Sequence, residues 1–204
     1  MKIDPDDITD FHLSKNRLEK VLLFWVCAAG HGGHQSSRAL EKFLYLVNTW
    51  LRERDISPKK SPFAAMRQMD SLQNDPEWIQ KFMALSGIGC HKNKSRAFRE
   101  IIYSGINLRK CTVNELEGLR GIGPKTARCF LIHSRPDQQY AGLDTHILHY
   151  LRDQGFDAPK TTPLGRKYRQ LEIEFLRLAR EAGKTVAELD LEIWLRYRRA
   201  EKNR

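Results

Sequence analysis

Helix start signals recur along the whole chain and constrain its fold more than any other feature of the sequence. Three prolines directly follow a residue that can cap a helix, at Asp4-Pro5, Ser61-Pro62 and Asp75-Pro76. Two further pairs have the Thr-x-x-Glu spacing of a capping box, namely Thr112 with Glu115 and Thr185 with Glu188. These signals predict a succession of helices separated by short connections.

The apolar residues between the start signals repeat with the period of an α-helix. Two stripes have the i, i+3, i+4 spacing of a buried helix face: Leu18, Val21, Leu22, Trp25 and Val26, then Ala39, Leu40, Phe43, Leu44, Val47 and Leu51. No segment shows the strict alternation of a half-buried strand. We therefore predict an all-α fold of about ten helices.

The charge balance favours a polyanionic partner. The 204 residues include 35 lysines and arginines against 25 acidic residues, a net charge of +10. The sequence shows no signal-peptide pattern and no apolar run long enough for a membrane span. We expect an intracellular monomer without membrane contact, in the cytoplasm or nucleoid, or in the nucleus of a eukaryote.

The four cysteines are widely separated, at Cys27, Cys90, Cys111 and Cys129. They form no Cys-x-x-Cys pair and no ferredoxin-like run. We therefore predict neither a zinc site nor an iron–sulfur cluster, and interpret the cysteines as small apolar side chains in a reducing compartment.

The segment Leu-Arg-Gly-Ile-Gly-Pro-Lys-Thr-Ala at residues 119–127 is the most informative motif. A Gly-x-Gly hairpin that opens into a helix presents backbone N–H groups, at the positive end of the helix dipole, to an anion. We predict that the backbone around Gly121, Gly123 and Thr126 binds DNA phosphates, which positions DNA without reading its sequence.

A lysine and an aspartate add chemistry to this phosphate site. Lys125 lies in the first turn of the helix, and Asp144 is the expected N-cap of the next one. Burial and the positive helix end both disfavour the ammonium form, so we expect a lowered pKa and a nucleophilic amine at Lys125. The pair indicates an enzyme that acts on nucleic acid.

Two glycine-rich segments interrupt the helical pattern. Residues 30–35, Gly-His-Gly-Gly-His-Gln, are expected to form a loop in which the backbone can approach a ligand closely. Residues 87–94 enter a basic helix through a second Gly-x-Gly. A plain helix connection is favoured there over a second phosphate contact.

The central motif resembles a known group of proteins. Residues 119–127, followed by Gly-Leu-Asp-Thr-His-Ile at 142–147, are similar to the helix-hairpin-helix/Gly-Pro-Asp DNA glycosylase superfamily, which includes endonuclease III and the 8-oxoguanine glycosylases. The run Glu-Leu-Asp-Leu-Glu-Ile-Trp at 188–194 is most similar to the archaeal-type 8-oxoguanine DNA glycosylase/lyase subfamily. The resemblance implies two helical lobes. One spans roughly residues 60–155, with the helix-hairpin-helix at 112–134, and the other combines 1–59 with 156–204.

The resemblance also implies roles for individual residues. Lys125 matches the nucleophile, Asp144 the catalytic aspartate, and His146 a histidine that lies against the DNA backbone. The matching hairpin carbonyls, which hold a potassium or sodium ion beside a phosphate, are those of Glu117, Leu119 and Ile122.

Base recognition requires a pocket for the extruded base and a wedge that fills the space it leaves. Trp194 matches a tryptophan of the base pocket, although its apolar helical neighbours fit core packing equally well. The other candidates lie in the first glycine-rich segment, at Gly30, His31, His34 and Gln35.

Together these features predict a bifunctional DNA N-glycosylase that acts on double-stranded DNA in base excision repair. It would remove an oxidised base, 8-oxoguanine in the first instance, through a lysine Schiff base and then cleave the strand by β-elimination, with no required cofactor. Two alternatives remain. The first is a glycosylase whose substrates are oxidised pyrimidines, because Thr145 follows Asp144 as in the endonuclease III branch. The tail also lacks the Thr-Gly and terminal lysine of the 8-oxoguanine subfamily, which leaves the same alternative open. A non-catalytic helix-hairpin-helix module would use the hairpin alone.

Overall fold

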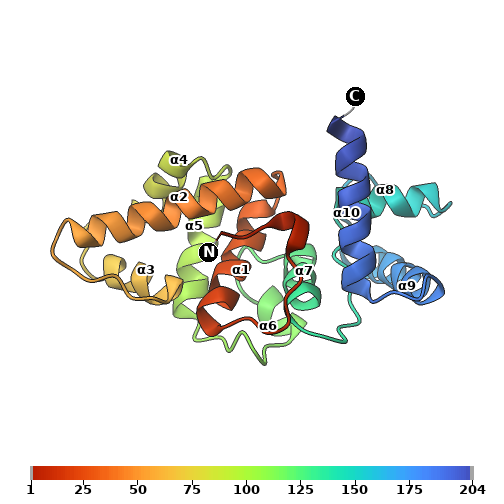
Figure 1. Cartoon of the computed structure of the whole chain (residues 1–204), viewed down its shortest axis with the longest axis horizontal. Helices are drawn as coiled ribbons and strands as arrows, with labels where there is room; N and C mark the ends of the chain where they lie inside the picture. The colour runs from red at the N-terminus through yellow and green to blue at the C-terminus, as the bar shows by residue number, and fades with distance from the viewer. Residues whose placement is uncertain (1, 203–204) are drawn as a thin grey trace. The chain divides into compact units, whose positions relative to one another are not determined.

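The computed structural model describes residues 2–202, with side chains up to residue 198. Within this range the chain forms ten α-helices, one 3-10 helix and no strand, which confirms the predicted all-α class (Figure 1). None of these helices is long and apolar enough to cross a membrane. The predicted lobe of residues 1–59 and 156–204 includes residue 1 and residues 203–204, which lie outside the described residues.

The first compact unit contains the residues up to Ile8 and those from His12 to Ile122. Its elements are η1 (Pro5–Asp7), α1 (Lys15–Ala28), α2 (Gly33–Arg52), α3 (Pro62–Asp70), α4 (Trp78–Ser86), α5 (His91–Tyr103) and α6 (Val113–Glu117). Phe43 of α2 stacks on Trp78 of α4 at a ring-centroid distance of 6.4 Å and meets Phe98 of α5 edge to face at 5.6 Å. These aromatic contacts join the N-terminal helices to the middle of the chain.

The second unit contains Thr9–Phe11 and the residues from Gly123 onward. Its helices are α7 (Pro124–Ser134), α8 (Thr145–Asp153), α9 (Gly165–Glu181) and α10 (Val186–Lys202). Their apolar faces share one core, whose largest members include Ile132, Leu143, Leu148, Tyr168, Phe175 and Ile193. Helix α10 packs against α7, α8 and α9.

The boundaries of the two units differ from those of the predicted lobes. The expected lobes divide the chain near residues 59 and 155, whereas the compact units divide it at Ile122. The reason is packing: α1 and α2 bury their apolar faces on α3, α4 and α5, so the N-terminal residues belong with the middle of the chain. Residues after Gly123 have a core of their own.

Several predicted helix starts are confirmed and others are displaced. Ser61 Oγ accepts the Ala64 N–H at 3.0 Å, and Thr112 forms the expected capping box. Asp4-Pro5 begins a 3-10 helix of three residues, and α4 begins at Trp78 because Asp75 Oδ1 instead caps a turn through the Glu77 N–H. The expected loop at 30–35 is also shorter, since α2 begins at Gly33.

The loop before α8 packs so closely on α7 that Gly142 has no room for a side chain. A Cβ atom there would lie 2.2 Å from Cys129 Sγ but 3.6 Å from Cys129 Cβ. We predict that Gly142→Ala lowers the free energy of unfolding by about 1–3 kcal/mol through overpacking, as measured by urea denaturation. Adding Cys129→Ala removes the sulfur and recovers most of the loss relative to Cys129→Ala alone. A double variant with the full loss would contradict this packing.

Candidate active site

The hairpin between α6 and α7 is held on α5 by contacts that require glycine. Gly121 has φ +82°, and a Cβ atom there would lie 2.6 Å from the Ala97 Cβ. The preceding Arg120 N–H donates to the Glu100 carboxylate at 3.0 Å. The order helix, Gly-Ile-Gly hairpin and helix predicted for residues 112–134 is therefore confirmed.

Gly123 opens the start of α7 toward solvent. It is the N-cap, its φ is −90°, and a Cβ atom at this position would meet no atom within 4 Å. Pro124 follows at the first helical position, and the Ala127 N–H donates to the Gly123 carbonyl at 3.1 Å. The amides before Ala127, including that of Thr126, therefore belong to the helix end, where a phosphate can accept from them.

The three carbonyls expected to hold a monovalent cation belong to the same turn. Glu117 ends α6, and the Leu119 carbonyl accepts the Ile122 N–H at 3.1 Å. A carbonyl oxygen has two lone pairs, so this bond leaves Leu119 able to bind an ion. Neutral oxygen ligands at a helix C-terminus suit a cation, and these residues therefore fit the predicted ion.

Lys125 and Asp144 lie in one charged site within the second unit. Lys125 is in the first turn of α7, and Asp144 is the N-cap of α8, as predicted. Asp144 Oδ1 accepts the N–H groups of His146 and Ile147, each at 2.9 Å. Both side chains are half-buried, and their charges interact.

The pKa of both groups is raised, by nearby negative charge at Lys125 and by burial at Asp144. Burial alone would lower the pKa of Lys125, but negative charge at Cys129, Asp144 and Asp190 outweighs it. Burial raises the pKa of Asp144, which Lys125 opposes and Asp190 reinforces. Because burial also raises the pKa of the Cys129 thiol, we attribute the effect on Lys125 at neutral pH to the two carboxylates. The lowered lysine pKa expected from the sequence is therefore wrong.

A buried network holds the loop that presents Asp144. Arg128 Nε donates to Glu172 Oε1 at 2.7 Å, and the same oxygen accepts the Ala141 N–H at 2.9 Å. The Tyr168 hydroxyl donates to the Ala141 carbonyl at 2.6 Å and accepts the Leu143 N–H at 3.2 Å. Two residues of α9 thus fix the three residues that precede Asp144.

Sequence reasoning did not find this network. Its signal was the presence of polar residues within the apolar stretches of α7 and α9. Arg128 and Glu172 are both buried, and Tyr168 belongs to the core of the second unit. Buried polar groups of this kind require partners, which makes them candidates for a structural network even without a motif.

The remaining candidates of the second unit lie on α8 and α10. The His146 ring is 6.5 Å from that of Tyr197, centroid to centroid. Trp194 is half-buried, with the Arg198 guanidinium 4.6 Å from its ring centroid. Trp194 follows Asp190 by one helical turn, so both lie on the same face of α10.

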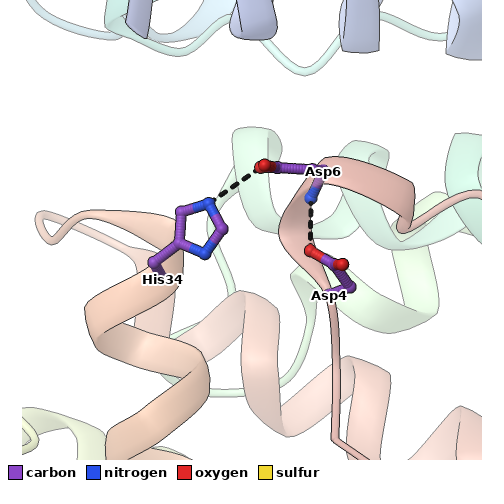
Figure 2. Close-up of side chains that lie close together, drawn as sticks. All are labelled: Asp4, Asp6 and His34. Atoms are coloured by element: carbon purple, nitrogen blue, oxygen red, sulfur yellow. Dashed lines mark hydrogen bonds and ion pairs between the residues drawn. The ribbon is translucent and has the colours of Figure 1, made fainter. Parts of the chain in front are cut away.

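The candidates from the first glycine-rich segment lie in the first unit, where His34 contacts an aspartate. His34 is in the first turn of α2, and its Nε2 lies 2.8 Å from Asp6 Oδ1 (Figure 2). The Asp6 N–H donates to Asp4 Oδ1 at 3.0 Å, so this cluster follows from the capping of η1 (Figure 2).

The His31 ring packs over Gly89, where an added Cβ would lie 2.2 Å from the ring. Gln35 lines a small cavity beside this ring. Gly30, with φ +73°, makes the turn before α2. In the second glycine segment, Gly87 is the left-handed C-cap of α4, and α5 begins at His91.

The sequence matches no protein-family model. The fold is similar to that of the 8-oxoguanine DNA glycosylase of Methanocaldococcus jannaschii, with a TM-score of 0.60 and 19% sequence identity over 92% of this chain and 81% of that one. The M. jannaschii 8-oxoguanine glycosylase/lyase in complex with a 15mer DNA containing 8-oxoguanine gives a TM-score of 0.59 and 20% identity, over 93% and 85% of the two chains. These likenesses confirm the predicted helical glycosylase fold.

The Tyr168 hydroxyl offers a direct test of the network around Asp144. Tyr168→Phe removes the hydroxyl from the Ala141 carbonyl and the Leu143 N–H, which keep only their bond to each other at 3.1 Å, so we expect the free energy of unfolding to fall by about 1–3 kcal/mol in urea denaturation. Tyr45 is 63% exposed, and Tyr45→Phe is the matched control with no expected change. Equal stability of the two variants would exclude the network.

Proposed function

We propose that this chain is a DNA glycosylase and AP lyase that removes an oxidised base, 8-oxoguanine, from double-stranded DNA. The observation that carries the proposal is the charged pair of Lys125 and Asp144, placed at the starts of the two helices that follow the hairpin. A module that only binds DNA needs the hairpin but has no use for a lysine and a carboxylate in one half-buried site. The fold shared with the M. jannaschii glycosylase supports the same reading.

In this mechanism the hairpin positions the DNA strand. A phosphate accepts hydrogen bonds from the amides at the start of α7, where the helix dipole favours negative charge. A potassium or sodium ion on the carbonyls of Glu117, Leu119 and Ile122 would supply positive charge beside that phosphate. His146, in the first turn of α8, would contact the backbone.

The first chemical step is a proton transfer within the pair. The Lys125 ammonium gives a proton to the Asp144 carboxylate, whose pKa is raised and which accepts it without a net change of charge. The neutral amine attacks C1′, the glycosidic bond breaks, and its electron pair leaves with the base, which takes up a proton. The departing base takes its proton from Asp144, and the carboxylate that is thereby ionised again stabilises the positive charge on the sugar.

The second stage opens the sugar and cleaves the strand. The ring oxygen leaves C1′ as the amine nitrogen loses its proton, which gives a Schiff base between Lys125 and the sugar. Loss of a 2′ proton then expels the 3′ phosphate, so the strand breaks by β-elimination. Water finally hydrolyses the Schiff base and frees the lysine.

The choice of 8-oxoguanine is supported by the lesion in the DNA complex of the M. jannaschii glycosylase/lyase. In this chain, Trp194 is an aromatic residue on the same helix face as Asp190, a residue whose charge acts on Lys125. A flat ring there can stack on an extruded base, and stacking suits a purine.

Borohydride trapping tests the lysine mechanism. We predict that the protein forms a covalent product with duplexes containing 8-oxoguanine or an abasic site, and that Lys125→Gln abolishes it because glutamine has no nucleophilic amine. Lys160 is an exposed lysine of the same unit, and Lys160→Gln should trap like the wild type. The product is measured on denaturing gels.

The same assay separates the alternatives. Preferential trapping on thymine glycol would assign the protein to oxidised pyrimidines. If the protein binds DNA but forms no covalent product on any duplex, the alternative of a non-catalytic helix-hairpin-helix module is favoured. A product that survives Lys125→Gln would place the nucleophile elsewhere. Asp144→Asn keeps an oxygen to cap α8 but removes the charge, so we expect folded protein with strongly reduced trapping.

Gly123→Ala tests the phosphate site. The φ of Gly123 suits alanine and its Cβ would meet open space, so stability should change by less than about 0.5 kcal/mol. The methyl group would stand where a phosphate approaches, and we expect roughly tenfold weaker binding to duplex DNA, measured by fluorescence anisotropy. Unchanged binding of folded Gly123→Ala to duplex DNA would argue against a phosphate at the hairpin.

A further inference from the structure

Asp190 is a buried carboxylate that the mechanism above does not use. It lies on α10, its residue is 8% exposed, and its Oδ2 is 3.1 Å from His133 Nε2. The other ring nitrogen of His133 lies 2.7 Å from the Thr9 hydroxyl, and its carbonyl accepts the Asp10 N–H at 3.0 Å. One oxygen of Asp190 is therefore held by a histidine that is itself fixed at two other atoms.

The second oxygen of Asp190 has no such contact. Oδ1 is buried and has no hydrogen-bond partner among the residues whose side chains are described. A buried carboxylate oxygen without a donor is costly, so its persistence in a well-packed core requires a compensating interaction. A structural hydrogen bond with His133 explains one oxygen and leaves the other unexplained.

The surroundings of Asp190 identify that interaction. Lys125, Cys129 and His133 are spaced by four residues and therefore share one face of α7. Helix α10 packs on α7, and Asp190 meets this face at His133. The Asp190 charge acts on Lys125, Cys129 and Asp144. Among these groups, Lys125 is the cation.

We propose that Asp190 is a positioning residue for Lys125: the charge of its carboxylate, whose second oxygen His133 leaves unused, attracts the Lys125 ammonium group toward the catalytic site. The role of Asp190 in catalysis rests on the proposed function. His133 and Thr9 fix the carboxylate, and Asp190 and Asp144 then attract the lysine from two different helices. The flexible side chain is thereby kept at the site before DNA binds.

This arrangement has a consequence for the titration of Lys125. The groups that face it are Cys129 on its own helix, Asp144 at the start of α8 and Asp190 on α10, while His146 acts on Asp144. A negative charge stabilises the ammonium form, so removal of Asp190 must lower the pH at which Lys125 loses its proton. A purely structural role through His133 would not require this shift.

The titration can be measured without DNA. In protein labelled with ¹³C and ¹⁵N in lysine, NMR follows the Cε and Nζ shifts of Lys125, assigned by their absence in Lys125→Arg. We expect Asp190→Asn to lower the titration midpoint by about one pH unit or more. Asp157 is a carboxylate of the same unit whose side chain is 97% exposed, and Asp157→Asn is the matched control that should leave the midpoint in place. An unchanged midpoint in folded Asp190→Asn overturns the proposal.

A second readout connects the charge to catalysis. The rate of borohydride trapping on an abasic duplex should rise with pH at a lower midpoint in Asp190→Asn than in the wild type, with a lower maximal rate. Asp190→Glu restores the charge and should restore the wild-type midpoint. A parallel fall in rate at every pH, without a shift, would assign Asp190 a structural role only and overturn the proposal.

Two further outcomes are decisive. If the wild type traps no abasic DNA at any pH, the proposed function fails, while the NMR titration still decides the relation between Asp190 and Lys125. If Asp190→Asn does not fold by circular dichroism, the smaller Asp190→Ser is titrated in its place. Failure of both variants to fold would identify Asp190 as a structural residue and overturn the proposal.

Discussion

The carboxylate of Glu172 is the contact on which the geometry of the candidate site depends. Its Oε1 accepts from the Arg128 guanidinium and from the Ala141 N–H, so one oxygen joins α7, α9 and the loop before α8. A buried ion pair of this kind contributes little net stability, but loss of one partner costs about 3–5 kcal/mol because it leaves a buried charge. Its effect is to select one arrangement of the three segments.

That arrangement determines where the reactive groups lie. Lys125 precedes Arg128 on α7 by three residues, and Asp144 follows Ala141 by three residues in the loop. Glu172 therefore fixes the relation between lysine and aspartate without contact to either. Within the loop, Tyr168 binds the residues on both sides of Gly142, and the absent side chain of Gly142 lets the loop close on Cys129.

The sequence predicted the local features well, because each depends on residues close together in the chain. The hairpin at Gly121 and Gly123, the capping box at Thr112 and the N-cap at Asp144 all need contacts within a few residues. The long-range contacts were not predictable in this way. Glu172 lies 44 residues from Arg128, and Asp190 lies 57 residues from His133. Only the folded chain shows that these charges meet.

The pKa of Lys125 also depends on long-range contacts, and its direction changes how the lysine must lose its proton. From the sequence, burial and a positive helix end predicted a neutral amine, whereas the carboxylates of Asp144 and Asp190 keep the ammonium form. A nucleophilic lysine must then pass its proton to a group already in place. Burial raises the pKa of Asp144, which makes this carboxylate a better acceptor than an exposed one. Transfer within the pair leaves the total charge of the site unchanged, so the amine can form without moving a proton from a half-buried site to solvent.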